Sequence, residues 1–382
     1  MQRTTRLALA VATALATAVA GAPAVAASTP EADPHTRGGH HAVFVQTDDP
    51  AGNRIIAYRR ADDGRLTPAG SYDTQGLGGV LDGSVADHLA SQGSLTYDPE
   101  HALLYAVNAG SDTVSVFSVD GDRLALRQVV GSGGRFPVSV AVHDDAVFVL
   151  NALDGGSVQG FTVHDGRLHE RADWNRCLGL DPNAAPQFTN TPGQVGFTGE
   201  GDQLVVTTKA NGSNLLVFGL DRSGTPADSP VVTHLPGAVP FAFVPHGRHG
   251  LQLAEAGTNA VATFAVHPDG TASQQAFATT GQSATCWIVA VRDLLYASNA
   301  GSSTLSGFRT ADHGRQLTAL GNTPTHPGTV DAAVSSDGRY LYAQTGVDGV
   351  VDEFAIDPDG SLTALGSQTV PQGVDGEGIV AF

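Results

Sequence analysis

The sequence is poor in basic residues, and this shortage limits the partners that the protein can have. Its 382 residues include 20 lysines and arginines against 38 aspartates and glutamates, which gives a formal net charge of −18. Such an excess of negative charge repels the phosphates of nucleic acids and the surface of anionic membranes. The composition therefore argues against nucleic-acid binding and fits a soluble extracellular protein.

Long apolar runs are also missing, with one exception at the N-terminus. There the run LALAVATALATAVAGA accompanies Arg3 and Arg6 and is followed by the small-residue motif AVA at 24–26. A positive start, an apolar stretch and an A-x-A site predict a secretory signal peptide over residues 1–27. No stop-transfer pattern follows, so we expect a secreted protein with no membrane attachment after cleavage. Residues 28–40 lack periodicity and are predicted to be a flexible lead-in.

Cysteine is scarce as well. The chain has two, Cys177 and Cys286, and an exported chain meets an oxidising compartment. Two interpretations stay open: a disulfide that pins the loop around Cys177 over the inner strand of Cys286, or a buried thiol at Cys286. The Cys/His spacings of zinc sites are absent, as are a phosphate-binding loop and a serine-nucleophile motif. We therefore expect no cofactor and no metal.

Helix-forming runs are few, whereas one phrase is repeated throughout the chain. The segment LLYASNAGSSTLSGF at 294–308 closely matches LLYAVNAGSDTVSVF at 103–117, and five more segments share its pattern of apolar run, polar turn and second run. The residues predicted to close the first run are Thr47, Asn108, Asn151, Lys209, Glu255, Asn299 and Thr345. The aromatic residues that close the second run are Tyr58, Phe117, Phe161, Phe218, Phe264, Phe308 and Phe354. Such repetition indicates a repeat architecture.

Each repeat extends to four short runs, which indicates a β-propeller. A tight turn such as HDGRL or DPDG follows the aromatic, and its Asp-Gly pair supplies the positive φ that a hairpin needs. Two further runs complete a unit of about 45 residues. The chain starts at the second run of a unit and ends in a spare first run, GEGIVAF; pairing the two closes the ring and removes its open edge. We predict one all-β domain over residues 41–382, a seven-bladed propeller with four antiparallel strands per blade.

The longest connections lie at one end of the predicted propeller. With the strands of each blade named A to D from the axis outward, the long segments 73–93 and 172–193 connect a strand D to the next strand A. The residues that close the B strands lie at the same end. We therefore expect the binding site at this mouth of the axial channel. Asn108 and Asn299 at this end are either turn caps or ligand contacts.

Other polar residues are candidates for the same mouth. Lys209 and Glu255 depart from the Thr/Asn pattern on adjacent blades, either as a simple ion pair or as an acid–base group tuned by its neighbour. Gln194 and Asp331 interrupt apolar A strands, where a carboxylate has to be solvated or paired. The remaining candidates are Cys286, one of Asp375 and Glu377, and the loop residue His88.

The segment SSDGRYLYAQTGVDGVVDEFAIDPDGSLTALG at 335–366 resembles the seven-bladed lactonase family. That family includes bacterial 6-phosphogluconolactonases and fungal carboxymuconate-lactonising enzymes. The resemblance covers residues 42–382, and the segments PGQVGFTGEGDQLVVTTKANGS and GQSATCWIVAVRDLLYASNAG look like secreted actinobacterial members. It implies the propeller fold and hydrolysis of a lactone or related cyclic ester at the channel mouth.

Taken position by position, the resemblance retains one catalytic group. The glutamate of the family, at the end of a strand B, matches Glu255 in LAEAGTN. Phe241 stands where an arginine is expected shortly before it, Ser139 lies in the region of an H-x-H motif, and Ala300 replaces a later arginine. Phosphorylated or carboxylated substrates need cationic groups. The replacements therefore argue against such substrates.

Two functions stay open. The first is a lactonase-like hydrolase in which Glu255 is the acid or base. Its substrate-binding residues would be Lys209, Gln194, Asp331, Asn299 and Asn108. The second is a non-catalytic extracellular propeller that binds a ligand or a protein, because propellers serve many functions. In both cases we expect a monomer whose partner is a small molecule or a cell-surface component.

Overall fold

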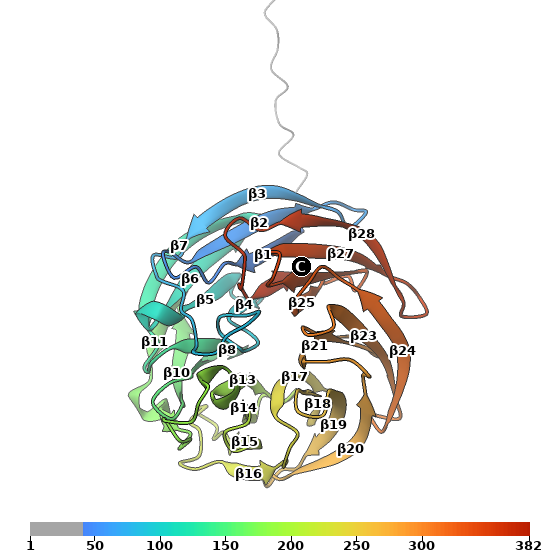
Figure 1. Ribbon diagram of the computed structural model, residues 1–382. Coiled ribbons are helices and arrows are strands. Elements are labelled where there is room, and N and C mark those ends of the chain that lie inside the picture. Colours follow the sequence, from blue (N-terminus) through green and yellow to red (C-terminus); the bar gives the residue numbers. More distant parts are fainter. Residues whose placement is uncertain (1–40) are drawn as a thin grey trace, which may run out of the picture. The chain divides into compact units, whose positions relative to one another are not determined.

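The computed structural model describes residues 41–382 as seven antiparallel sheets arranged around one axis (Figure 1). The predicted all-β, seven-bladed propeller is therefore confirmed. The predicted signal peptide and lead-in lie outside the described residues. Within the described part of the chain, no helix has the length and apolar character needed to cross a bilayer.

Each blade runs from strand A at the axis to strand D at the rim. The A strands are β29 (Ile379–Ala381), β4 (Leu95–Asp98), β8 (Pro137–His143), β13 (Pro192–Phe197), β17 (Pro240–His246), β21 (Thr285–Val291) and β25 (Thr329–Val334). The B strands are β1 (Ala42–Gln46), β5 (Leu103–Asn108), β9 (Ala146–Asn151), β14 (Gln203–Thr208), β18 (Gly250–Glu255), β22 (Leu294–Asn299) and β26 (Tyr340–Thr345).

The outer strands complete the blades in the same order. The C strands are β2 (Arg54–Arg60), β6 (Thr113–Asp120), β10 (Ser157–His164), β15 (Asn214–Gly219), β19 (Ala260–Val266), β23 (Thr304–Ala311) and β27 (Val350–Ile356). The D strands are β3 (Leu66–Asp73), β7 (Arg123–Gly131), β11 (Arg167–Glu170), β16 (Val231–His234), β20 (Ala272–Thr279), β24 (Gln316–Pro324) and β28 (Leu362–Thr369).

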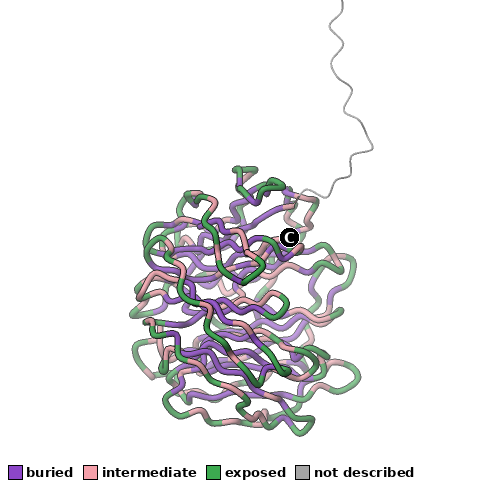
Figure 2. The backbone as a smooth tube through the Cα atoms, turned by 90° about the vertical axis from the view of Figure 1, so that its right-hand side faces the viewer, coloured by how far each residue is buried: buried purple, intermediate pink, exposed green. Residues whose placement is uncertain are grey.

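Burial follows the position of a strand within its blade. Strand B is covered on both faces by neighbouring blades, so β5, β14, β22 and β26 are buried along their whole length. The rim strands have one solvated face, and their residues alternate between more and less exposed, as in β7. Figure 2 shows the buried strands inside and the exposed connections outside. The apolar runs of the sequence are therefore mostly B strands.

The ring closes through the two ends of the described chain, as predicted. Strand β1 pairs with β29, with Val43 opposite Ala381 and Val45 opposite Ile379. The first blade therefore takes strand A from the C-terminal end and its other three strands from the N-terminal end. No inner strand edge is left unpaired in this blade, which removes a surface open to edge-to-edge association.

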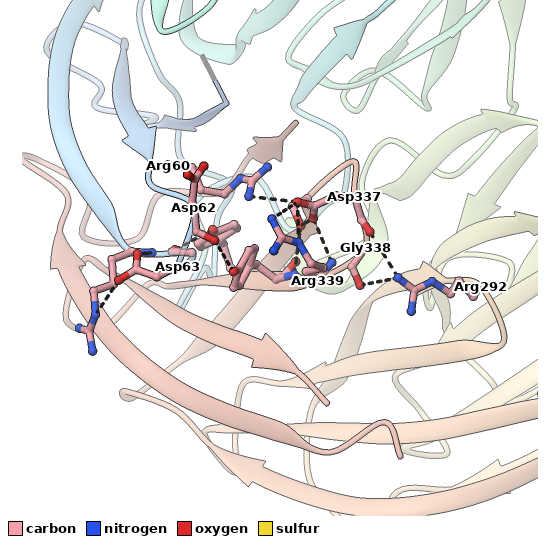
Figure 3. A network of polar contacts seen from close by, with 12 residues as sticks. Arg60, Asp62, Asp63, Arg292, Asp337, Gly338 and Arg339 are labelled. Carbon is pink, nitrogen blue, oxygen red and sulfur yellow. Dashed lines mark hydrogen bonds and ion pairs between the residues drawn. The ribbon is translucent and has the colours of Figure 1, made fainter. Parts of the chain in front are cut away.

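A polar network reinforces the seam between the seventh and first blades (Figure 3). Arg60, at the end of β2, has no exposed side-chain surface and lies 3.2 Å from the Oδ2 atom of Asp337. Arg339 pairs with the same carboxylate at 3.0 Å, and both guanidinium groups lie over the ring of Tyr340. Arg292 of the sixth blade donates to the carbonyl of Gly338. Three consecutive blades are thus joined through one turn.

The connections define two ends of the propeller, which we call the loop face and the turn face. The loop face carries the D–A connections and the B–C turns, and the turn face carries the A–B and C–D turns. The predicted long loop 172–193 is more structured than expected. It contains η2 (Ala172–Trp174), β12 (Arg176–Cys177) and α1 (Gln187–Asn190), and β12 pairs with β10 as a second rim strand.

Candidate functional site

A cavity of about 440 Å³ lies on the axis of the propeller at the turn face. Residues of β4, β8, β13, β17, β25 and β29 line it, together with the A–B turn that follows β13. Phe197 and Phe243 contribute apolar surface, whereas polar groups come from Gln92, Thr96, His143, Gln194, Thr198 and Asp331. A concave site of this size that combines apolar and polar side chains suits a small-molecule ligand. The cavity is at the opposite end of the channel from the predicted mouth.

Asp331 is the acidic group of this cavity. It lies within a bulge in the pairing of β25 with β26, between Thr329 and Ala332, and its side chain is almost fully buried. Its Oδ1 atom accepts a hydrogen bond from the backbone N–H of Ala332 at 2.9 Å. Burial raises the pKa of Asp331 to about 7, more than the backbone hydrogen bonds lower it. The carboxyl group is therefore divided between its two protonation states near neutral pH, as a general base requires.

Gln194 is oriented by its neighbours. It follows a bulge in the pairing of β13 with β14, and its backbone N–H donates to the Oγ1 atom of Thr207 at 2.9 Å. Its Oε1 atom accepts a hydrogen bond from the backbone N–H of Phe243 on the next blade at 2.7 Å. The amide is held in one orientation, and its Nε2 group is the donor left for the cavity. Gln194 and Asp331 are the two predicted site residues that the structure places on this cavity.

The loop-face end of the channel is closed by part of the long loop between β3 and β4. We call residues 81–93 the plug. Leu81, Leu89 and Ala90 are fully buried. The hydroxyl of Ser91 donates a hydrogen bond to the carbonyl of Val138 at 2.9 Å. The carbonyl of Ser91 accepts a hydrogen bond from the indole N–H of Trp287 at 2.5 Å. The plug thus reaches the third and sixth blades at once.

Gln92 forms the tip of the plug and the floor of the axial cavity. Its side-chain amide donates to the carbonyl of Ile288 at 3.1 Å and accepts from the backbone N–H of the same residue at 2.9 Å. Its backbone N–H donates to the carbonyl of Gly193 at 3.1 Å, and its carbonyl accepts from the hydroxyl of Ser139 at 2.7 Å. The tip of the plug is therefore hydrogen-bonded across the axis to three blades.

Lys209, the single lysine of the chain, holds the plug from the fourth blade. It is 1% exposed, and its amino group donates to the carbonyl of Ala90 at 2.6 Å. The amino group also lies over the rings of Phe188 and Phe241. Burial lowers the pKa of Lys209 to about 7, although the nearby Asp87 favours the charged form. The amine therefore serves the plug and does not reach the cavity lining.

The lysine is outnumbered by buried carboxyl groups. Asp87 belongs to the plug, where its Oδ1 atom accepts from the backbone N–H of Leu89 at 2.7 Å, and burial raises its pKa to about 6. Burial also raises the pKa of Glu377, whose Oε2 atom accepts from the hydroxyl of Ser91 at 3.0 Å. Burial raises the pKa of Asp48 to about 8. Neither Asp48 nor Asp87 was among the site residues predicted from the sequence.

A comparison with protein-family models matches residues 82–377 to the family described as "Lactonase, 7-bladed beta-propeller". The chain belongs to this lactonase family. A comparison with curated proteins found no match. Among solved structures, the chain is similar to a candidate 6-phosphogluconolactonase from Bacteroides fragilis, with 17% identity, a TM-score of 0.72 and coverage of 92% of this chain and 100% of the other.

Two further structures show the same fold. A candidate 6-phosphogluconolactonase from Bacteroides uniformis has 18% identity and a TM-score of 0.73, and the match covers 90% of this chain and 100% of the other. The periplasmic gluconolactonase PpgL of Pseudomonas aeruginosa has 18% identity and a TM-score of 0.70, over 89% of this chain and 98% of the other. At such identities the likeness establishes the lactonase propeller fold and no more.

Two of the three positions at which this lactonase-family chain departs from the expected motif contact the plug or its lysine. Ser139 lies in the region expected to hold a histidine motif, and its hydroxyl donates to the carbonyl of Gln92. Phe241 replaces an expected arginine and packs under the amino group of Lys209. Ala300, at the third position, lies in the B–C turn of the sixth blade, where its N–H donates to the carbonyl of Ala284. Two of the three replacements therefore help to close the loop-face end.

The structure corrects the alignment of Lys209. In the fourth blade the residue that closes strand B is Thr208, which pairs with Asn214. The hydroxyl of Thr208 accepts a hydrogen bond from the backbone N–H of Asn214 at 3.0 Å. In the seventh blade the hydroxyl of Thr345 accepts a hydrogen bond from the backbone N–H of Val350 in the same way. Lys209 is one residue further along, and a shift of one residue changes the side of the strand to which a side chain points. This explains why Lys209 departs from the Thr/Asn pattern.

The other predicted residues of strand B serve local structure. Asn108 donates to the hydroxyls of Thr113 and Ser115, and Asn299 donates to those of Thr304 and Ser306, so both cap their turns. Glu255 closes β18, is 3% exposed and accepts a hydrogen bond from the hydroxyl of Thr258 at 2.9 Å. Burial raises the pKa of Glu255.

Glu255 lies on the loop face, outside the lining of the axial cavity. Within residues 41–382, its carboxylate forms no ion pair with Lys209, which is held by the plug instead. His88 also belongs to the plug and lies 3.6 Å from the Oδ2 atom of Asp375. The catalytic role of Glu255 stays a prediction.

The two cysteines are free, so the disulfide interpretation is wrong. Cys177 is exposed on β12, which pairs with β10 near the rim of the third blade. Cys286 is buried on the inner strand β21, at the axis of the propeller. Burial raises the pKa of the Cys286 thiol to about 12. The alternative interpretation, a buried thiol at Cys286, is the one that the structure shows.

Proposed function

We propose that this lactonase-family protein hydrolyses a small, uncharged lactone in the axial cavity at the turn face. The observation that carries the proposal is Asp331, a carboxyl group with a pKa of about 7 on the wall of an open cavity. A general base is most effective when its pKa lies near the working pH. Family membership supports the reaction class, and the cavity supports the location.

The proposed reaction needs one proton acceptor and one hydrogen-bond donor. The ionised Asp331 accepts a proton from a water molecule, whose oxygen attacks the lactone carbonyl carbon. The negative charge that forms on the carbonyl oxygen accepts a hydrogen bond from the Nε2 group of Gln194, which its bond to Phe243 holds in place. The ring C–O bond then breaks, and protonated Asp331 returns its proton to the departing oxygen. The product is the open-chain hydroxy acid.

The cavity favours an uncharged substrate. Among the described residues that line it, none is lysine or arginine, and Asp331 contributes an acidic group. A phosphate or carboxylate on the substrate would find no lysine or arginine to pair with it, and His143 is the one lining residue able to take up a positive charge. The Bacteroides relatives are described as candidate 6-phosphogluconolactonases and the Pseudomonas relative as a gluconolactonase. Of these two substrate types, the unphosphorylated sugar lactone fits this cavity better.

The test is lactone hydrolysis by the wild-type protein and two variants. We expect turnover of δ-gluconolactone above the spontaneous rate at pH 6 to 7, and weaker turnover of 6-phosphogluconolactone. Asp331→Asn keeps the size of the side chain and removes the base, so kcat/KM should fall about 100-fold or more. Glu255→Gln is the matched comparison and should leave turnover unchanged. Full activity in Asp331→Asn, or its loss in Glu255→Gln alone, would place the chemistry at the loop face instead.

A second candidate is a propeller that binds a ligand without converting it. The observation in its favour is that Lys209 and Ser139 hold the plug. Under this alternative, calorimetry should detect binding of a sugar lactone or its hydroxy acid that survives both variants, with no turnover. Absence of both turnover and binding across neutral lactones, hydroxy acids and cell-wall glycans would contradict both candidates.

A further inference from the structure

We propose that the plug, residues 81–93, is a gate. It leaves the loop-face end of the channel as the carboxyl groups packed against it ionise, and its departure exposes Lys209 and Cys286 to solvent. The plug also forms the floor of the axial cavity through Gln92, but the proposal does not depend on lactone hydrolysis, because it is tested by the exposure of Lys209 and Cys286 and not by turnover. It rests on how the plug is held and on the charges enclosed around it.

The plug is held to the blades mainly by polar contacts. The tip residues Ser91 and Gln92 form hydrogen bonds to Val138, Trp287, Ile288, Gly193 and Ser139. Water can replace these partners when the segment leaves the channel, so each neutral hydrogen bond opposes opening by about 1 kcal/mol, and the bond from Lys209 to Ala90 by somewhat more. Burial of Leu81, Leu89 and Ala90 is the apolar contribution to closure. No disulfide ties the plug to the blades that surround it.

The charges around the plug are unbalanced. The plug itself carries Asp82, Asp87 and His88. The groups that face it from the blades and from the 370–378 connection are Lys209 after β14, Asp331 on β25, Asp48 after β1, Cys286 on β21, and Asp375 and Glu377. Among the fully buried members of this set, Lys209 is the one base, and the others are acids. The Oδ2 atom of Asp87 and the Oε1 atom of Glu377 have no hydrogen-bond partner within residues 41–382.

This imbalance sets the direction of the pH dependence. Burial raises the pKa of Asp87 to about 6 and raises that of Glu377, so the closed state retains protons that the open state releases. Opening therefore becomes more favourable as the pH rises from about 5, by up to tenfold per pH unit for each group that loses its proton. Lys209 opposes this trend above about pH 7. In that range Lys209 has lost its proton in the closed state and keeps it in the open state, so a further rise in pH favours closure.

The two buried side chains provide the assay. Cys177 is exposed, so a Cys177→Ser background leaves Cys286 as the only thiol. Its labelling by 4,4′-dithiodipyridine is measured at pH 5, 6, 7 and 8 and divided by the rate for urea-unfolded protein at the same pH. We expect this normalised rate to rise at least tenfold from pH 5 to 7. Acetylation of Lys209, followed by mass spectrometry, should show the same rise, because no other lysine competes.

Control measurements separate the gate from global unfolding. Opening of one loop exposes little surface, so the labelling rate should respond weakly to low urea concentrations. Glu377→Gln should reduce the pH dependence, whereas Asp375→Asn, at the more exposed rim of the plug, should leave most of it. Ser91→Ala, which removes hydrogen bonds to Val138 and Glu377, should speed labelling at every pH and serves if Glu377→Gln does not fold. A normalised rate that is independent of pH, or that follows global unfolding in urea, would overturn the proposal.

Discussion

Asp48 makes the stability of the protein depend on pH in a way that one substitution can isolate. It lies in the first B–C turn, is 1% exposed, and accepts the backbone N–H of Glu377 on Oδ2 at 2.8 Å. Burial raises its pKa from an ordinary 3.8 to about 8. Because the folded state keeps a proton that the unfolded state releases, the free energy of unfolding falls as the pH rises between these two values.

The magnitude follows from the size of the shift. Each pH unit inside this window changes the free energy of unfolding by up to about 1.4 kcal/mol for one group. Between pH 5 and 7, Asp48 alone should therefore cost the wild type on the order of 3 kcal/mol. Asp48→Asn keeps the shape and one carbonyl acceptor but cannot ionise. The backbone at this position has a φ of 52°, which asparagine tolerates well.

The assay is urea unfolding of the wild type and Asp48→Asn at pH 5, 6 and 7, followed by circular dichroism. Titrating groups far from Asp48 are common to the two proteins, so their contributions cancel in the difference; Asp87 and Glu377 interact with Asp48 and keep a smaller residual contribution. We expect the variant to gain stability relative to the wild type by about 1.4 kcal/mol per pH unit. A difference that stays constant from pH 5 to 7 would refute the reasoning, because it would mean that Asp48 is ionised in the folded protein.

Two further predictions concern buried cations. Lys209→Met removes the hydrogen bond to Ala90 and the buried amino group near Asp87, so at pH 6 urea unfolding should show a loss of about 3 kcal/mol. An unchanged midpoint would mean that the lysine contributes nothing to closure. Asp337→Asn leaves the buried guanidinium of Arg60 without its carboxylate and should lower the free energy of unfolding by about 3 kcal/mol. Asp63→Asn removes an exposed ion pair and should lower it by less than about 1 kcal/mol. Equal effects of the last two variants would contradict the role assigned to the seam network.

The propeller could be predicted from the sequence because its signals are local. An apolar run, a closing aromatic and a glycine-containing turn recur in every unit, and each is set by residues close together in the chain. The pairing of β1 with β29 joins the two ends of the described chain. It too was predictable, because the first unit lacks its first strand and the last run of the chain is a spare first strand. Only the register of the fourth blade was wrong, by one residue.

That error shows where local patterns stop being informative. The segment TTKANGS contains two threonines before the lysine, and the apolar pattern alone does not say which of them closes the strand. The choice is made by Asn214 on the neighbouring strand, which pairs with Thr208. Register is a property of two strands together, so one strand read alone leaves it open.

The sequence by itself therefore determined the fold, the number of blades and the closure of the ring, because hydrophobic period and turn chemistry repeat along the chain. Only the tertiary structure decided which end of the channel is open. That residues 81–93 turn inward depends on donors and acceptors from several blades, such as Ser139, Ile288 and Lys209. These groups lie far apart in the chain and meet only at the axis. Their contacts with the plug bury one lysine among several carboxyl groups and leave Asp331 on the wall of the cavity that stays open.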